Sequence, residues 1–147
     1  MDQATSERPS LKLVRHYPVA PEKVWRAWTD PQKLKRWFGP DPADEVTLAE
    51  TDLRVGGRYH IVFGKPGGEV HDVSGVYQEV EPNRKLVFSW AWRTTPERES
   101  QVTIEIRPDA DGSILTLTHE QFFNQKACDD HRRGWGLALD QLERLLP

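Results

Sequence analysis

The stretch NQKACDDHRRGWGLALDQLERLL, residues 124–146, decides the fold because it reads as one long amphipathic helix. Its charged residues fall mostly on one side, the face expected to meet water. Asn124 is the expected N-cap, since its side-chain oxygen can accept a hydrogen bond from a free N–H of the first turn. The other side carries an apolar stripe with the helical period of about 3.6 residues, made of Ala127, His131, Trp135, Ala138, Leu142 and Leu145. The rest of the chain must therefore supply a partner for one buried helix face.

Two glycines interrupt this helix at Gly134-Trp135-Gly136. Each glycine in a helix interior costs about 1 kcal/mol relative to alanine. Either another group approaches the helix closely at this point, or the glycines make room for Trp135 against its partner. The sequence leaves both explanations open.

Composition limits the classes of protein to consider. A chain of 147 residues is long enough for one domain, expected over residues 10–147 after a flexible polar start at residues 1–9. The net charge of −3 gives no basic excess, which excludes nucleic-acid binding. The lone Cys128 cannot form an internal disulfide, and there is no leader and no apolar run of membrane length. We therefore expect a cytoplasmic protein without a membrane span.

The preceding chain is expected to form one strand, two short helices and then about six antiparallel strands. A strand is predicted at residues 11–17, followed by two short helices that begin at Pro21 and Pro31, the second capped by Asp30. From Glu45 the apolar period changes to two, which predicts a series of antiparallel strands, one of them bulged at Gly75. The long helix must cover the apolar face of this curved sheet, and a hollow between helix and sheet would be a ligand site.

Several blocks carry a resemblance to a known family. RHYPVAPEKVWRAWTDP (15–31), LKRWFGP (34–40), VGGRY (55–59), GVYQEVEP (75–82), LVFSW (86–90) and LTLTHE (115–120) look like those of the activator of heat-shock protein 90 ATPase-like family, as do GW (134–135) and LDQL (139–142). That family belongs to the START-like, or SRPBCC, superfamily, shared with birch-pollen-allergen-like proteins and polyketide cyclases. The resemblance implies an α+β helix-grip fold, a curved antiparallel sheet of about six or seven strands around a long C-terminal helix. Such a fold hosts binders, transporters and enzymes alike.

Aromatic side chains dominate the predicted inner face. They suit a flat or lipid-like apolar ligand, although the same rings could instead fill the space and leave no cavity. His119 would either meet a ligand's polar end or be a hydrogen-bonded core group. The predicted ligand-binding residues are Trp25, Trp28, Trp37, Phe38, Tyr59, Phe63, Phe88, Trp90, Trp92, Leu117, His119, His131 and Trp135.

No catalytic or metal-binding pattern is recognisable. The histidines lack metal-ligand spacing, and Cys128, although near a helix start, has no identifiable partner base. We therefore expect no metal, no cofactor and no catalytic residue, with enzymatic activity left open.

Three functions remain as hypotheses. The first is capture of a small hydrophobic or aromatic ligand, whose polar end His119 or His131 would meet. The second is a protein-interaction module that docks a chaperone or other protein, with co-chaperone-like stimulation of a heat-shock protein 90 ATPase in stress response; exposed Trp37 and Phe38 would favour it. The third is a cyclase-like or hydrolase-like enzyme, favoured by an enclosed His119 paired with a carboxylate.

Overall fold

The computed structural model describes residues 8–146. Residues 1–7, most of the segment predicted to be flexible, lie outside the described part. The elements run in the order β1 (Leu11–Tyr17), α2 (Pro21–Thr29), α3 (Pro31–Trp37), β2 (Glu45–Thr51), β3 (Arg58–Gly64), β4 (Val70–Glu81), β5 (Lys85–Trp92), β6 (Ser100–Asp109), β7 (Gly112–Glu120) and α4 (Gln125–Leu145).

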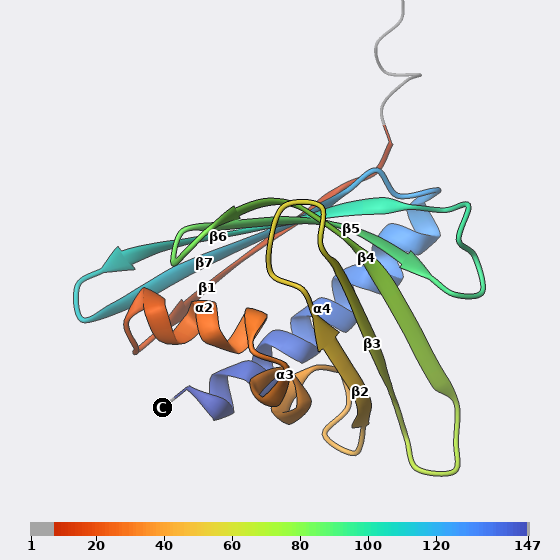
Figure 1. Ribbon diagram of the computed structural model, residues 1–147, viewed down its shortest axis with the longest axis horizontal. Coiled ribbons are helices and arrows are strands. Elements are labelled where there is room, and N and C mark those ends of the chain that lie inside the picture. Colours follow the sequence, from red (N-terminus) through yellow and green to blue (C-terminus); the bar gives the residue numbers. More distant parts are fainter. Residues whose placement is uncertain (1–7, 147) are drawn as a thin grey trace, which may run out of the picture.

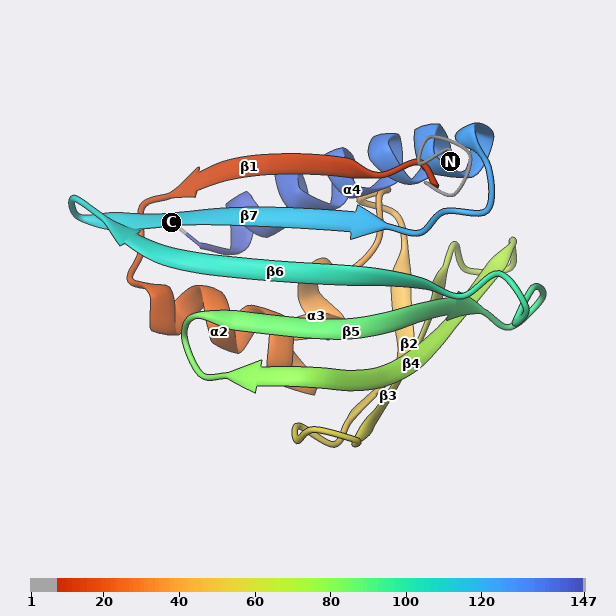
Figure 2. The ribbon, with the colours of Figure 1, turned by 90° about the horizontal axis from the view of Figure 1, so that it is seen from above.

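The strands form one antiparallel sheet of seven in the order β1-β7-β6-β5-β4-β3-β2. The first strand therefore pairs with the last, from Leu11 opposite His119 to Tyr17 opposite Ser113. Figure 1 shows the three helices on one side of the curved sheet, with α4 running across it, and Figure 2 shows the same layers from above. This arrangement confirms the predicted α+β helix-grip fold.

The helix starts follow the predicted caps. The Asn124 side chain accepts a hydrogen bond from the Ala127 N–H at 2.9 Å. The Asp30 side chain accepts one from the Gln32 N–H, also at 2.9 Å, and Pro31 occupies the first turn of α3. Each cap satisfies a backbone donor that the helix itself leaves unpaired, and this fixes where the chain turns into the helix.

The predicted bulge in β4 is present but was placed at the wrong residue. The register between β4 and β5 shifts between Tyr77 and Glu79, not at Gly75. Gly75 has another role, because a side-chain Cβ there would overlap the Ser89 carbonyl oxygen and lie 2.8 Å from the Tyr59 ring. The glycine thus allows close approach of neighbouring groups, whereas the extra residue is accommodated further along the strand.

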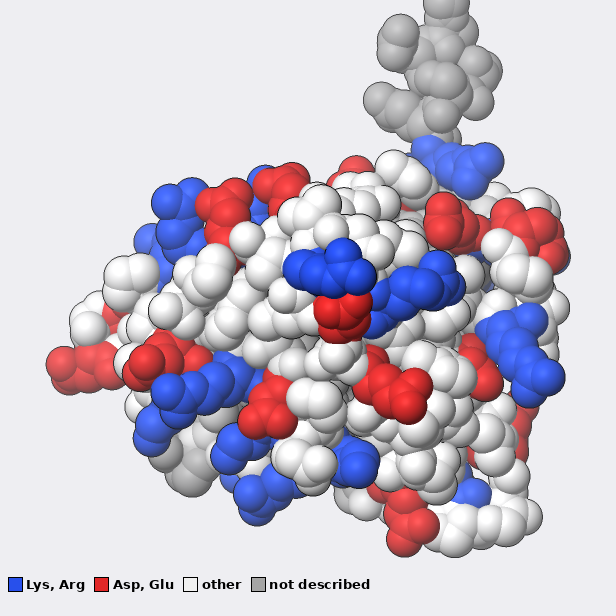
Figure 3. Space-filling model, in the orientation of Figure 1, with Lys and Arg blue, Asp and Glu red and all other residues white. Residues whose placement is uncertain are grey.

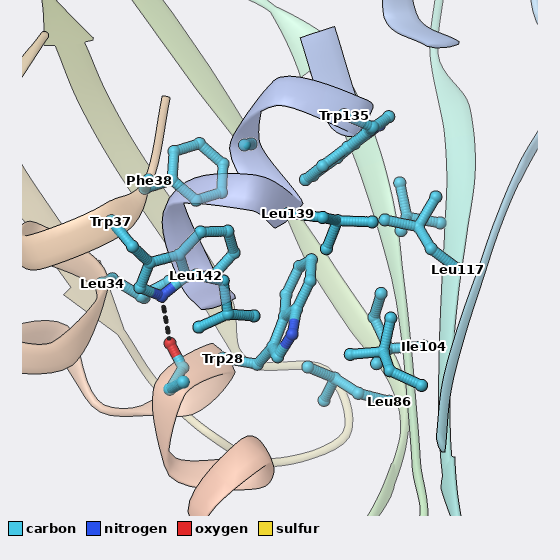
Figure 4. Close-up of a cluster of buried hydrophobic side chains, with 14 of the residues drawn as sticks. Trp28, Leu34, Trp37, Phe38, Leu86, Ile104, Leu117, Trp135, Leu139 and Leu142 are labelled. Atoms are coloured by element: carbon cyan, nitrogen blue, oxygen red, sulfur yellow. Dashed lines mark hydrogen bonds between the residues drawn. The ribbon is translucent and has the colours of Figure 1, made fainter. Parts of the chain in front are cut away.

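The buried side of α4 packs onto the sheet and onto α2. Figure 4 shows Trp135, Leu139 and Leu142 of α4 facing Trp28 and the side chains of the central strands. Leu139 and Leu142 are fully buried, and each buried leucine stabilises the fold by about 1.5–3 kcal/mol. The interior beside Trp28 leaves a cavity of only about 20 Å³, room for about one water molecule.

The surface carries mixed charge. On the face shown in Figure 3, Lys and Arg side chains are interspersed with Asp and Glu. Among the helices of residues 8–146, none has the length and apolar character that crossing a bilayer requires.

Candidate functional site

An open cleft of about 320 Å³ lies between the middle of α4, the strands β3 to β5 and the segment that follows α3. Its volume falls at the lower end of the range of about 300–1,000 Å³ found for small-molecule sites. The residues that line it are Phe38, Gly39, Pro40, Phe63, His71, Trp90, Trp92, Asp130, His131, Gly134, Trp135 and Ala138.

Three neighbouring strands supply an aromatic wall to the cleft. Phe63 of β3 and His71 of β4 are cross-strand partners whose ring centroids are 5.2 Å apart. The Trp92 ring of β5 lies 6.2 Å from Phe63 and 6.0 Å from His71. Side chains at paired positions on one face of a sheet stand side by side, so sheet pairing itself assembles this wall.

His131 of α4 holds the inner part of the wall in place. Its Nε2 atom accepts hydrogen bonds from the indole N–H groups of Trp92 at 3.1 Å and Trp90 at 3.3 Å. Because an indole N–H can only donate, Nε2 carries no proton, and the Nδ1–H donates to the Ala127 carbonyl at 2.7 Å. Burial lowers the pKa of His131, although the Ala127 hydrogen bond and the Asp130 charge oppose this. The imidazole is therefore neutral, with both nitrogens engaged.

His119 lies behind the cleft as a hydrogen-bonded core group. It is fully buried, and its Nδ1 accepts from the Trp135 indole at 2.9 Å. Its Nε2–H therefore donates to the Ser100 hydroxyl at 2.7 Å, which in turn donates to the Trp90 carbonyl at 3.3 Å. Burial, followed by the neighbouring His131, holds the pKa of His119 well below its usual value. No nitrogen of His119 is left for a ligand.

Besides His131, the polar side chains at the cleft are Asp130 and His71. The Asp130 carboxylate accepts a hydrogen bond from Lys126 at 2.9 Å, and this bond lowers the pKa of Asp130. His71 is half-buried, with its Nε2 4.0 Å from Glu69. The partners of both groups, Lys126 and Glu69, are exposed, which places Asp130 and His71 at the outer rim of the cleft. The polar end of a ligand would therefore contact the protein at this rim.

The thirteen predicted site residues divide into three groups. One group lines the cleft: Phe38, Phe63, Trp90, Trp92, His131 and Trp135. A second group borders the small interior cavity: Trp28, Tyr59 and Phe88, beside Phe38 and Trp90. The others are buried away from both cavities: Trp25, Trp37, Leu117 and His119.

Half of the cleft lining lies outside the predicted ligand-binding set, although Ala138 belongs to the predicted apolar stripe: Gly39, Pro40, His71, Asp130, Gly134 and Ala138. His71 and Asp130 are polar residues whose position depends on register and helix rotation. Gly134 did carry a signal, because a glycine inside a helix needs a reason. Gly134 lines the cleft, and a Cβ at this position would point into open space, with no atom within 4 Å.

The cleft lining lacks the commonest nucleophilic side chains. It contains no serine, threonine, cysteine or lysine. Cys128 is buried, and burial raises the pKa of its thiol, opposite to what a nucleophile needs. Within residues 8–146, no three His, Cys, Asp or Glu side chains are arranged to hold a metal ion.

Residues 18–147 match the family described as Activator of Hsp90 ATPase homolog 1-like protein. The chain belongs to this family. No curated protein matches the sequence. Among the solved structures similar to this chain is a Silicibacter pomeroyi protein described as AHSA1. The two chains are 30% identical, with a TM-score of 0.82 over 94% of this chain and 97% of that chain.

Two further bacterial structures have the same fold. A Chromobacterium violaceum protein is 27% identical, with a TM-score of 0.84 over 94% of this chain and 97% of its own. A Nitrosomonas europaea protein is 28% identical, with a TM-score of 0.79 over 93% of both chains. These neighbours confirm the START-like (SRPBCC) resemblance that the sequence blocks indicated.

Proposed function

We propose that the protein binds a small apolar or aromatic ligand in the open cleft. The observation that carries this proposal is the cleft itself, about 320 Å³ in volume and lined mainly by aromatic rings. Binding is equilibrium capture without a chemical step. We also propose that the protein is cytoplasmic.

The hydrogen bonds around the cleft favour an apolar ligand body. The indole N–H groups of Trp90 and Trp92 are both engaged by His131. An apolar ligand therefore covers these side chains without leaving an unpaired donor, which would oppose binding. Each Å² of apolar surface that leaves water contributes about 25 cal/mol before the cost of association. The ligand's polar end stays at the rim near Asp130 and His71, not at His119 or His131.

Two specific features named for the other hypotheses, exposed Trp37 and Phe38 and a pairing of His119 with a carboxylate, are not found among the described residues. Trp37 and Phe38 are only 3% and 6% exposed, so they offer no docking patch to a chaperone or other protein. His119 is enclosed, but its partners are Ser100 and Trp135, not a carboxylate. Ligand capture is thus the function that the geometry supports best.

A panel of fatty acids, sterols and polycyclic aromatics tests the proposal by tryptophan fluorescence and thermal melting. A ligand at one hundred times its Kd should stabilise the fold by about 2.7 kcal/mol, because it binds only the folded state. For a chain of this size that raises the melting temperature by about 5–10 °C.

Two tryptophan variants test whether the fluorescence change arises in the cleft. Trp92→Phe removes an indole that lines the cleft, whereas Trp25→Phe removes one that does not. The quenching should be reduced in the first variant and kept in the second. A panel that changes neither fluorescence nor melting temperature would contradict ligand capture.

A further inference from the structure

We infer that the cleft selects a flat, uncharged, fused-ring aromatic ligand with a hydroxyl group at one edge, and that Gly134 is the residue that admits it. This inference rests on the proposed function and narrows it to one chemical class. It excludes the lipid-like alkyl ligands that the sequence left open.

The first support is the kind of side chain that lines the cleft. Seven of the twelve lining residues carry aromatic rings, and none is leucine, isoleucine, valine or methionine. The small interior cavity differs, because Leu34, Ile61 and Leu86 contribute to it. Ring pairs gain a favourable contact beyond the area they bury, whereas an alkyl chain gains from area alone. A ligand made of fused rings therefore makes better use of this lining.

The second support is the missing side chain on the helix side. Gly134 lies three residues after His131 and four before Ala138, so all three share the helix face that lines the cleft. A Cβ at Gly134 would meet no atom within 4 Å. The glycine is thus not needed for packing within the protein. It leaves open a part of the cleft that a larger side chain would occupy, and there a ring can lie against the helix backbone.

Gly136 provides the comparison within the same helix. A Cβ there would lie 3.8 Å from the Arg15 guanidinium, an ordinary contact with a flexible side chain. Arg15 also donates to the Gly136 carbonyl at 3.1 Å and pairs with Asp140 at 3.3 Å. Gly136 does not line the cleft. The two glycines therefore face different surroundings although they are two residues apart.

The third support is the placement of polar groups. The inner indole N–H groups of Trp90 and Trp92 are engaged by His131, so deep polar atoms on a ligand would find no partner there. At the rim, the Asp130 carboxylate can accept a hydrogen bond, and its negative charge disfavours an anionic ligand. Lys126 already pairs with this carboxylate at 2.9 Å, so a cationic ligand gains less there than an unpaired charge would give. A single hydroxyl group on the outer edge of the ring system meets both conditions.

Calorimetric titration of the full chain with 2-naphthol and 1-decanol tests the class of ligand. Each alcohol has ten carbon atoms and one hydroxyl group, but 1-decanol is flexible and has the larger apolar surface. Burial of area alone would therefore favour 1-decanol, whereas ring contacts favour 2-naphthol. We expect 2-naphthol to bind about tenfold more tightly or better, since the lining favours ring contacts. Equal or tighter binding of 1-decanol would overturn the inference while leaving ligand capture in place. If neither alcohol nor any compound of the panel binds, both proposals fall.

Gly134→Leu and Gly136→Leu test the role of the glycine. Both substitutions improve helix propensity to a similar extent, and circular dichroism with thermal melting verifies that both variants fold. Gly134→Leu should weaken 2-naphthol binding about tenfold or more, because the new side chain occupies the ligand's space. Gly136→Leu should leave the affinity unchanged. Unchanged affinity in Gly134→Leu, or an equal loss in both variants, would overturn the assignment of Gly134.

Discussion

Acidification is expected to destabilise the fold through the buried His119 and the half-buried His131. His119 and His131 each accept indole hydrogen bonds on an unprotonated nitrogen, and burial lowers the pKa of both. In the unfolded chain, both side chains titrate near their ordinary pKa of about 6.5. Below that pH the unfolded state takes up protons that the folded state excludes. Stability is therefore present above about pH 6.5 and is lost as the pH falls.

The magnitude follows from proton linkage. A histidine that stays neutral in the folded state loses about 1.4 kcal/mol of stabilisation between about pH 7.5 and about pH 5.5. This value is the upper limit for His131, because the Ala127 carbonyl and Asp130 partly restore its pKa. The carboxylates of Asp41 and Asp130 have lowered pKa values and stay ionised in this window, so they do not obscure the effect.

The assay is urea unfolding of the wild type and of His131→Gln at the two pH values. Glutamine removes the titrating group but keeps an oxygen that can accept from Trp90 and Trp92. The wild type should lose more stability on acidification than the variant, by up to about 1.4 kcal/mol. An equal loss in both proteins, or a wild type that gains stability at low pH, would show that His131 does not stay neutral in the folded state.

Three further predictions concern stability and use urea unfolding at neutral pH. Trp37→Phe should lower the free energy of unfolding by about 1 kcal/mol more than Trp28→Phe. The reason is that the Trp37 indole donates to the Ala27 carbonyl, whereas the buried Trp28 indole has no partner within residues 8–146. Equal losses in the two variants would contradict this. Gly75→Ala should cost about 3 kcal/mol or more, since its Cβ overlaps backbone, and a neutral effect would show that β4 can move aside. Asn124→Ala should cost about 1 kcal/mol through the lost cap of α4, and no change would remove its assigned role.

The helical parts of the fold could be predicted from the sequence because helix signals are local. The caps at Asp30 and Asn124 and the apolar stripe of α4 depend only on residues within a few positions of each other. The predicted stripe was only partly right, because it omitted Leu139, which is fully buried. Its members Ala127, His131 and Leu145 are half-buried. Trp135 and Leu142 of the predicted stripe are buried as expected.

The strands were harder because register is set by partners far along the chain. The bulge in β4 falls near Tyr77 rather than Gly75, and nothing within the strand distinguishes the two positions. His71 could not be predicted at the cleft for the same reason, because its position there depends on its pairing with Phe63 of another strand.

The site was predicted between sheet and helix, and the structure divides that region into a filled interior and an open cleft. Trp28 and Trp135 lie 5.7 Å apart between ring centroids and occupy the interior that could otherwise have been a hollow. The number of tryptophans in the sequence does not tell whether they fill a core or line a cavity. The structure shows both uses, with the cleft to the side of the filled core.

The most direct test of ligand capture in the cleft is the indole N–H region of a proton–nitrogen correlation spectrum during titration with 2-naphthol. The chain has six tryptophans, each with its own indole signal, assigned by single Trp→Phe variants. Ligand capture in the cleft predicts shifts for Trp90, Trp92 and Trp135, which line the cleft, and none for Trp25 and Trp37, which do not. Saturation that moves Trp25 or Trp37 while leaving the three cleft signals in place would contradict it.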